Sequence, residues 1–128
     1  MKYRLGLFDS GIGGTTVLKS IEERHSEFKA VYVADTARMP YGSRSPLEIR
    51  VIAQEIIQWL NVQQIDAIIV ACNTTNSLAF DVIKKHSIFP IFDLVSSTVE
   101  LIKESDSRLG VLATSSTVSS KAYTQEYS

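Results

Sequence analysis

The chain has 128 residues, of which 45% are hydrophobic and 21% are charged, an ordinary composition for one globular domain. Thirteen basic and fourteen acidic residues give a net charge of −1 without any block of like charge, so nothing favours nucleic acid or an anionic membrane as a partner. No apolar run approaches the roughly 20 residues that a membrane-spanning helix needs. The single cysteine cannot form an internal disulfide, which favours a cytoplasmic location.

Five short apolar runs predict β-strands along the chain. Their apolar residues are continuous rather than alternating, which is typical of strands covered on both faces, as in a parallel sheet. The runs are Tyr3–Phe8, Ala30–Ala34, Ala67–Ala71, Ile88–Asp93 and Leu109–Ala113.

Helical periodicity fills the segments between these runs. The strongest stripe places apolar residues at i, i+3, i+4, i+7, i+8 and i+11 from Ile49 to Leu60. Ser45 and Glu48 form a capping-box pattern before it, and Pro46 suits the first helical position. Further helices are predicted at Thr15–Arg24 and Asn76–Lys85, and a last one begins near Thr117.

The alternation of strands and helices predicts an α/β fold with a doubly wound parallel sheet in the order βαβαβαβαβα. Ser97 and Glu100 repeat the capping-box spacing before an apolar pair, so a helix is expected to begin there. The polar stretch at Ser96 and Ser97 is the nearest feature to a domain boundary, although composition alone does not require a division.

Three polar turns follow predicted strands. Asp9-Ser10-Gly11 follows the first strand, the segment 35–43 follows the second, and Cys72-Asn73-Thr74 follows the third. Ligands of open α/β sheets bind at the carboxyl ends of the strands. We therefore expect the three turns to meet at one edge of the sheet.

The first turn, residues 9–14, resembles a phosphate-binding turn, but the match is incomplete. The dinucleotide pattern G-x-G-x-x-G has Thr16 at its third glycine position, and no P-loop lysine is present. An aspartate-nucleophile phosphatase would need a second aspartate where Gly11 stands. A glycine-rich turn with an Asp9 cap and glycines at positive φ explains the pattern equally well.

The loop of residues 38–43 is explained on its own by a surface turn made by Pro40 and Gly42. Tyr41 and the backbone donors near Gly42 become candidate site groups because this loop follows the second strand, at the edge where the other two turns lie.

Cys72 is the candidate reactive group. Free cysteines are most often inert core residues, but this one stands at a strand tip directly before a helix. The partial positive charge of a helix N-terminus favours thiolate. A cysteine-based phosphatase is excluded because Leu78 stands where its arginine is required, and one cysteine with two distant histidines predicts no metal site.

The three turns together resemble the glutamate racemases of bacterial cell-wall synthesis, within the broader aspartate/glutamate racemase group. The matching stretches are residues 6–14, 34–42 and 70–74, and residues 109–114 are similar to the strand that opens the second domain of that family. The resemblance implies a flavodoxin-like half of a two-domain enzyme. Residues 1–96 would form the first domain, incomplete at its C-terminal end, and residues 97–128 the opening β-α portion of the second.

The resemblance also implies the activity, which is interconversion of L- and D-glutamate by proton transfer between two cysteines, without a cofactor. The product D-glutamate would serve peptidoglycan synthesis, and aspartate is the alternative substrate. The resemblance also implies a homodimer of the complete protein.

By the same resemblance Cys72 is one of the two cysteines, and Asp9 either binds the substrate's ammonium or helps to deprotonate Cys72. The groups expected to hold the substrate are Asp9, Ser10, Tyr41, Gly42, Asn73 and Thr74. The family's second cysteine lies in a Cys-Thr-His segment that these 128 residues do not contain. A truncated, non-catalytic remnant that binds an acidic amino acid weakly is therefore the alternative function.

Overall fold

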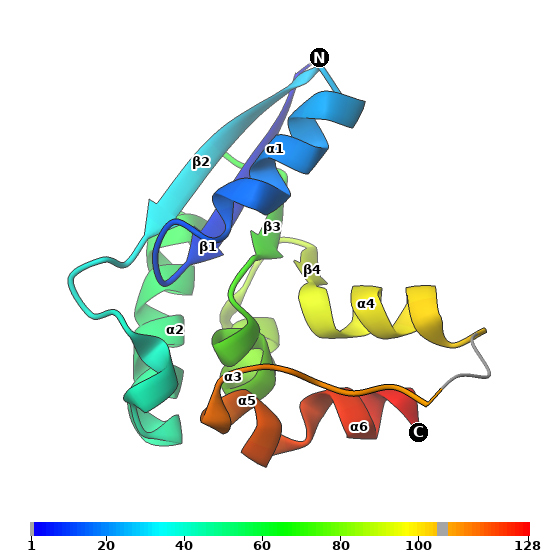
Figure 1. Ribbon diagram of the computed structural model, residues 1–128. Helices are drawn as coiled ribbons and strands as arrows, with labels where there is room; N and C mark the ends of the chain where they lie inside the picture. The colour runs from blue at the N-terminus through cyan, green and yellow to red at the C-terminus, as the bar shows by residue number, and fades with distance from the viewer. Residues whose placement is uncertain (1, 105–107) are drawn as a thin grey trace.

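The computed structural model describes residues 2–104 and 108–128 and shows a parallel sheet with helices on both faces (Figure 1). The elements in chain order are β1 (Tyr3–Asp9), α1 (Thr15–Arg24), β2 (Phe28–Ala34), the 3₁₀ helix η1 (Tyr41–Ser43), α2 (Pro46–Asn61), β3 (Ala67–Val70), α3 (Asn73–His86), β4 (Ile91–Asp93), α4 (Leu94–Ile102), α5 (Ser115–Ser120) and α6 (Ala122–Tyr127). None of the helices in the described ranges is both long and apolar enough to cross a bilayer.

The four strands pair in the order β2-β1-β3-β4, all parallel. The chain passes from β1 to β2 on one side and then returns to place β3 on the other side of β1. This reversal confirms the predicted doubly wound parallel sheet. It also creates a topological switch point between the carboxyl ends of β1 and β3, which is where such sheets bind ligands.

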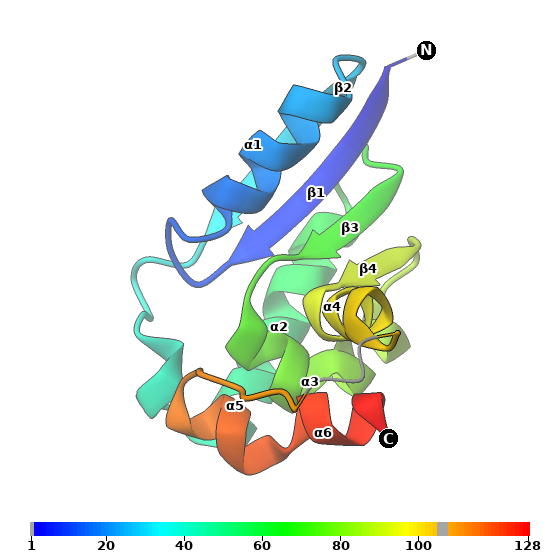
Figure 2. The same cartoon turned by 45° about the vertical axis from the view of Figure 1, so that its right-hand side comes forward.

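The main core lies between the sheet and the pair of helices α2 and α3, and Figure 2 shows α1 on the opposite face. The sheet contributes Phe8, Ile68 and Val70, α2 contributes Ile49, Ile52, Ala53, Ile56, Ile57 and Leu60, and α3 contributes Ala79 and Ile83. On the rim, Arg50 of α2 donates two hydrogen bonds of 2.7 Å to the Asp81 carboxylate of α3. The apolar stripe predicted for α2 is thus its buried face.

The predicted start of α2 is confirmed in detail. The Ser45 hydroxyl accepts from the Glu48 amide at 3.3 Å, and the Glu48 carboxylate accepts from the Ser45 amide at 2.9 Å. Pro46 occupies the first helical position, where its missing N–H leaves no helical bond unmade.

The face of the sheet that carries α1 is covered unevenly. Leu7, Ile69 and Phe92 lie side by side on this face, in one row across β1, β3 and β4. Leu7 is fully buried, Ile69 is half-buried, and Phe92 is 57% exposed. Helix α1 lies over β1 and β2 and has no fully buried residue (Figures 1 and 2). Packing on this face therefore weakens steadily from β1 towards β4.

The prediction of a fifth strand at Leu109–Ala113 is wrong, because residues 108–114 form no strand and Leu112 is fully exposed. A strand is held by hydrogen bonds to a neighbouring strand, and the described sheet ends at β4. The fourth strand is also shorter than predicted and begins at Ile91, directly after Pro90, which has no N–H to donate.

The prediction that a helix begins at Ser97 is wrong as well. Helix α4 begins at Leu94, because the Asp93 carboxylate caps it by accepting from the Ser96 amide at 2.7 Å. Ser97 lies inside the helix and donates to the Asp93 carbonyl at 2.6 Å. The boundary between residues 96 and 97 thus falls within α4. The division into 1–96 and 97–128 stays a prediction, and residues 105–107 lie outside the described residues.

Two helix ends also differ from the prediction. Helix α3 begins at Asn73, three residues before the predicted start at Asn76. The C-terminal helix predicted near Thr117 is divided into α5 and α6 by Lys121, whose φ of 57° interrupts the helical backbone.

Candidate functional site

The three polar turns meet at the carboxyl edge of the sheet, as predicted. The sheet's hydrogen bonding continues into them: the Asp35 amide donates to the Asp9 carbonyl at 3.1 Å, and the Ala71 amide donates to the Phe8 carbonyl at 2.8 Å. The turns after β1, β2 and β3 are therefore attached to one another at their first residues, and they flank the switch point between β1 and β3.

The first turn packs tightly against the third. The Asp9 carboxylate is buried and accepts from the Gly14 amide at 2.8 Å. A Cβ at Gly14 would lie 2.9 Å from the Cβ atoms of both Asp9 and Ala71, so any other residue there would force the turn to shift. None of the described glycines has a positive φ, so the alternative explanation by left-handed glycines does not hold, and close approach is what Gly14 provides. Ser10 lies half-buried on the same turn.

Tyr32 of β2 lies beside this turn and was missed by the sequence analysis. Its hydroxyl donates to the Gly11 carbonyl at 3.1 Å. Burial raises the pKa of Tyr32, and interactions with Asp9 and Cys72 raise it further.

Cys72 is the N-cap residue of α3 and is 5% exposed. Its backbone is extended, with φ −107° and ψ 113°, and its side chain makes no capping hydrogen bond. The thiol belongs to the main core cluster, together with Phe8 and Tyr41. The strand-to-helix junction thus brings the thiol to the carboxyl edge of the sheet, as predicted, beside the switch point.

Tyr41 is almost completely buried, with its ring edge-to-face against Phe8 at a centroid distance of 6.4 Å. Its hydroxyl donates to the Asp35 carboxylate at 2.5 Å. Burial raises the pKa of Tyr41 well above its ordinary value, and the hydrogen bond to Asp35 and the charge of Asp35 raise it further. Tyr41 is therefore a neutral phenol at physiological pH and is not available as a base.

A chain of charged groups ties the loop of Tyr41 to helix α2. Arg38 donates from Nε to the Asp35 carboxylate at 2.7 Å and from a terminal nitrogen to the Glu55 carboxylate at 2.5 Å. No local sequence signal indicates the whole network, because Glu55 is distant in sequence, although Asp35 and Arg38 stand three residues apart within the matched stretch.

The segment beginning at Thr114 contacts two of the predicted site residues. A Cβ at Gly42 would lie 2.9 Å from the Thr114 Cγ2 atom, and the Ser116 hydroxyl donates to the Gly42 carbonyl at 2.9 Å. The hydroxyls of Thr74 and Thr114 lie 3.2 Å apart. Residues 114–116 therefore line the same edge of the sheet as the three turns, which no local sequence signal indicates.

Helix α6 reaches the same edge through Tyr123. Its hydroxyl donates to the Asn73 Oδ1 atom at 2.5 Å. Asn73 itself is exposed, whereas the neighbouring Thr74 is buried. The predicted site residues thus include buried Asp9, Tyr41, Cys72 and Thr74, half-buried Ser10 and Gly42, and exposed Asn73.

The edge combines a carboxylate, a thiol, hydroxyl groups and backbone amides. A buried carboxylate such as Asp9 suits an ammonium group, and amide or hydroxyl donors suit carboxylates. Within the described ranges, no three side chains of His, Cys, Asp or Glu converge in a way that would hold a metal ion.

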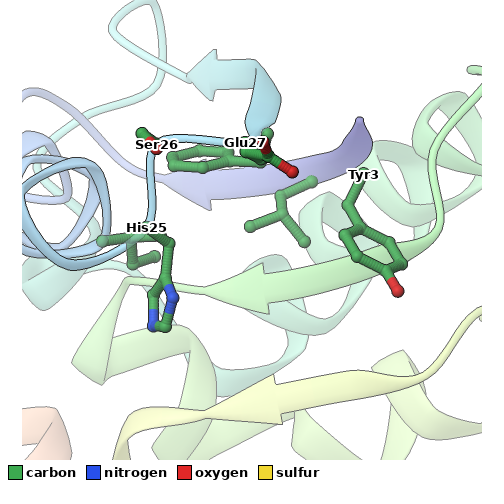
Figure 3. Close-up of a pocket in the computed structure, with 7 residues that line it drawn as sticks. Tyr3, His25, Ser26 and Glu27 are labelled. Atoms are coloured by element: carbon green, nitrogen blue, oxygen red, sulfur yellow. The ribbon is translucent and has the colours of Figure 1, made fainter. Parts of the chain in front are cut away.

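A separate cavity of about 380 Å³ lies at the amino ends of the strands. Figure 3 shows Tyr3, His25, Ser26 and Glu27 around it. Its lining is mostly apolar and comes from the first residues of β1 and β2 and from the end of α1, at the opposite end of the strands from Cys72.

The Asp/Glu/Hydantoin racemase family matches residues 12–128, which is nearly the whole chain. The chain belongs to this family. A glutamate racemase of Prochlorococcus marinus is 54% identical over 121 residues, which cover 94% of this chain and 45% of that relative. A glutamate racemase of Gloeobacter violaceus is 42% identical over 121 residues, which cover 94% of this chain and 46% of that relative.

Solved structures of racemases share the fold. The glutamate racemase of Aquifex pyrophilus superimposes with a TM-score of 0.91 at 38% identity, over 97% of this chain and 50% of that one. The glutamate racemase of Francisella tularensis, in complex with D-glutamate, gives a TM-score of 0.93 at 34% identity, over 98% of this chain and 48% of that one. The chain spans about half the length of these racemases.

Proposed function

We propose that this chain carries the first acid–base cysteine of a glutamate racemase that interconverts L- and D-glutamate without a cofactor. The product D-glutamate would supply peptidoglycan synthesis. The observation that carries the proposal is the position of Cys72 at the switch point, directly after Ala71, which is bonded to β1, and in one buried cluster with Phe8 and Tyr41.

In the proposed reaction, the Cys72 thiolate removes the Cα proton of glutamate from one face. The ammonium group would lie against Asp9, and donors from Asn73, Thr74 and the backbone near Gly42 would bind the carboxylates. Such donors stabilise the negative charge that develops as the proton leaves. Because Tyr41 stays protonated and donates to Asp35, it does not compete with the thiolate for the proton.

Inversion requires a second acid on the opposite face of the substrate, and this chain has only one cysteine. We therefore expect the 128 residues alone to exchange the Cα hydrogen without racemising glutamate. Half of a cleft also lacks much of the positioning and water exclusion that lower the barrier.

Glutamate is the proposed substrate rather than aspartate because the compared relatives are named glutamate racemases and one solved structure holds D-glutamate. We also propose that the protein is located in the cytoplasm and that the complete protein forms a homodimer. The single cysteine also supports a second candidate, a non-catalytic remnant that binds an acidic amino acid weakly.

The test incubates the purified chain with D-glutamate in D₂O and follows the Cα proton by NMR and the optical activity by circular dichroism. We expect slow Cα exchange with retained optical activity, and no exchange in Cys72→Ser. Absence of exchange in the parent chain would favour the remnant. Sustained loss of optical activity that depends on Cys72 would show that one cysteine suffices, and faster exchange with D-aspartate would overturn the choice of substrate.

A further inference from the structure

Asn76 joins the two sides of the junction that carries Cys72. It lies in the first turn of α3 and is 5% exposed. Its Nδ2 atom donates to the Val70 carbonyl at 2.7 Å and to the Cys72 carbonyl at 2.9 Å. One buried side-chain amide thus binds the last residue of β3 and the N-cap residue of α3 at the same time.

These two bonds restrict the backbone on either side of the thiol. The Cys72 carbonyl also accepts the Asn76 amide at 2.9 Å, which is the first hydrogen bond of α3. On the strand side, the Ala71 amide is bound to β1. Since the thiol makes no capping bond, the backbone and the surrounding core alone set its position.

The polar side chain of Asn76 lowers the stability of the fold, and packing alone does not explain why a polar residue stands at this position. Its Oδ1 atom is buried and accepts no hydrogen bond from the described residues. A buried acceptor without a partner destabilises a protein, and an apolar side chain of the same size would avoid this loss. What asparagine provides here, and leucine cannot, is the pair of bonds across the junction.

We propose that Asn76 is a positioning residue that holds the Cys72 thiol at the switch point by binding both the strand end and the helix start. The proposal rests on the proposed function only in one respect, which is the role of the thiol as an acid–base group. The positioning itself is a property of the folded chain and is measurable without any substrate.

The solitary thiol makes the measurement direct, because alkylation of the chain by iodoacetamide reports Cys72 alone. The rate is followed by mass spectrometry from pH 6 to 10 without glutamate. Asn76→Leu and Asn76→Asp both remove the donor at nearly constant size. Loss of two bonds to buried carbonyls favours local opening of the junction, so we expect alkylation to accelerate about tenfold or more, with an altered pH profile.

Two further variants separate positioning from general destabilisation. Asn76→Thr retains a hydroxyl that can donate to the carbonyl one turn earlier, which is that of Cys72, so its rate should lie between those of the parent and Asn76→Leu. Asp81→Asn breaks the ion pair with Arg50, which holds α3 to α2 without touching the junction, and should leave the alkylation profile unchanged.

An Asn76→Leu profile that matches the parent would overturn the proposal. It would also be overturned if Asp81→Asn, at an equal loss of unfolding free energy in urea, accelerated alkylation as much. If Asn76→Leu does not fold, the comparison of Asn76→Thr with Asp81→Asn decides in the same way. A failure of the racemase proposal would appear separately, as absent Cα exchange in the parent chain.

Discussion

The two faces of the sheet are built differently. The face towards α2 and α3 holds a continuous core that includes Ile57, Phe8 and Cys72. On the other face, helix α1 has no fully buried residue, and Phe92 is exposed at the far end. The candidate site draws on both faces, because Cys72 and Tyr41 belong to the first and the turn of Asp9 leads into α1.

The difference shows that two kinds of force hold the site groups. Cys72 and Tyr41 lie in the buried core, which contributes stability in proportion to the apolar area removed from water, and hydrogen bonds from Asn76 and to Asp35 add to it. The turn of Asp9 is fixed instead by the Gly14 amide bond and by the close approach of Gly14 to Ala71. Substitutions on the face of α2 and α3 should therefore change stability through the volume of the core. Substitutions in the turn that leads into α1 should change it through local geometry.

The largest expected effect is on the α2 face. Ile57→Ala removes a fully buried side chain and should lower the free energy of unfolding by about 2–5 kcal/mol, measured by urea denaturation. Ile21→Ala is the matched change on half-buried α1 and should cost about 1 kcal/mol or less. Equal losses for the two variants would show that the faces contribute alike.

Tyr41→Phe tests the polar part of that same core. It removes a hydrogen bond to the Asp35 carboxylate and should cost about 1.5–3 kcal/mol at pH 8. The raised pKa of Tyr41 means that the folded state favours the protonated phenol. The unfolded chain ionises first, so the parent loses stability as the pH rises above about 10.

Because phenylalanine does not titrate, the Tyr41→Phe variant should lose less stability between pH 9 and 11. Some loss remains in the variant, since burial also raises the pKa values of Tyr32 and Tyr123. Urea titrations of both proteins at pH 8, 9.5 and 11 make the comparison. Parallel curves would mean that Tyr41 ionises in the folded protein as it does in the unfolded chain.

Gly14→Ala tests how the turn that leads into α1 is held in place. The added Cβ would lie 2.8 Å from the Tyr32 hydroxyl, so the turn must shift, at a cost of about 1–3 kcal/mol. Gly13→Ala is the control, because its Cβ would make an ordinary contact of 3.5 Å with the Asp9 carboxylate. If Gly14→Ala is no worse than Gly13→Ala in urea, close approach does not hold this turn.

The smallest expected effect is at the C-terminal segment. Tyr123→Phe removes the hydrogen bond to Asn73 and should cost about 1 kcal/mol or less. Amide hydrogen exchange should nevertheless quicken in α6, because this bond links α6 to α3. Unchanged exchange in α6 would show that other contacts hold the helix in place.

The sequence predicted best where local chemistry decides the structure. The start of α2 followed from Ser45, Pro46 and Glu48, all within four residues. The parallel sheet followed from continuous apolar runs, and Cys72 was expected at a strand tip and lies there.

The wrong predictions concern features that depend on groups outside the local sequence pattern. Leu109–Ala113 has strand composition, but a strand needs a neighbour, which composition cannot supply. Ser97 has a capping-box partner, yet Asp93, the last residue of β4, caps the helix earlier. The partners of Arg38 and Gly42, which are Glu55 and Thr114, are visible only once the chain has folded.

The bonds from Ala71 to Phe8 and from Asp35 to Asp9 extend the sheet by one residue into the turns. The separation of the site groups is therefore set by the spacing of neighbouring strands, about 4.8 Å. Insertions later in the turns should leave that separation unchanged. A one-residue slip of β3 against β1 would turn each β3 side chain to the opposite face. The register of β3 against β1 thus determines which β3 side chains face the core.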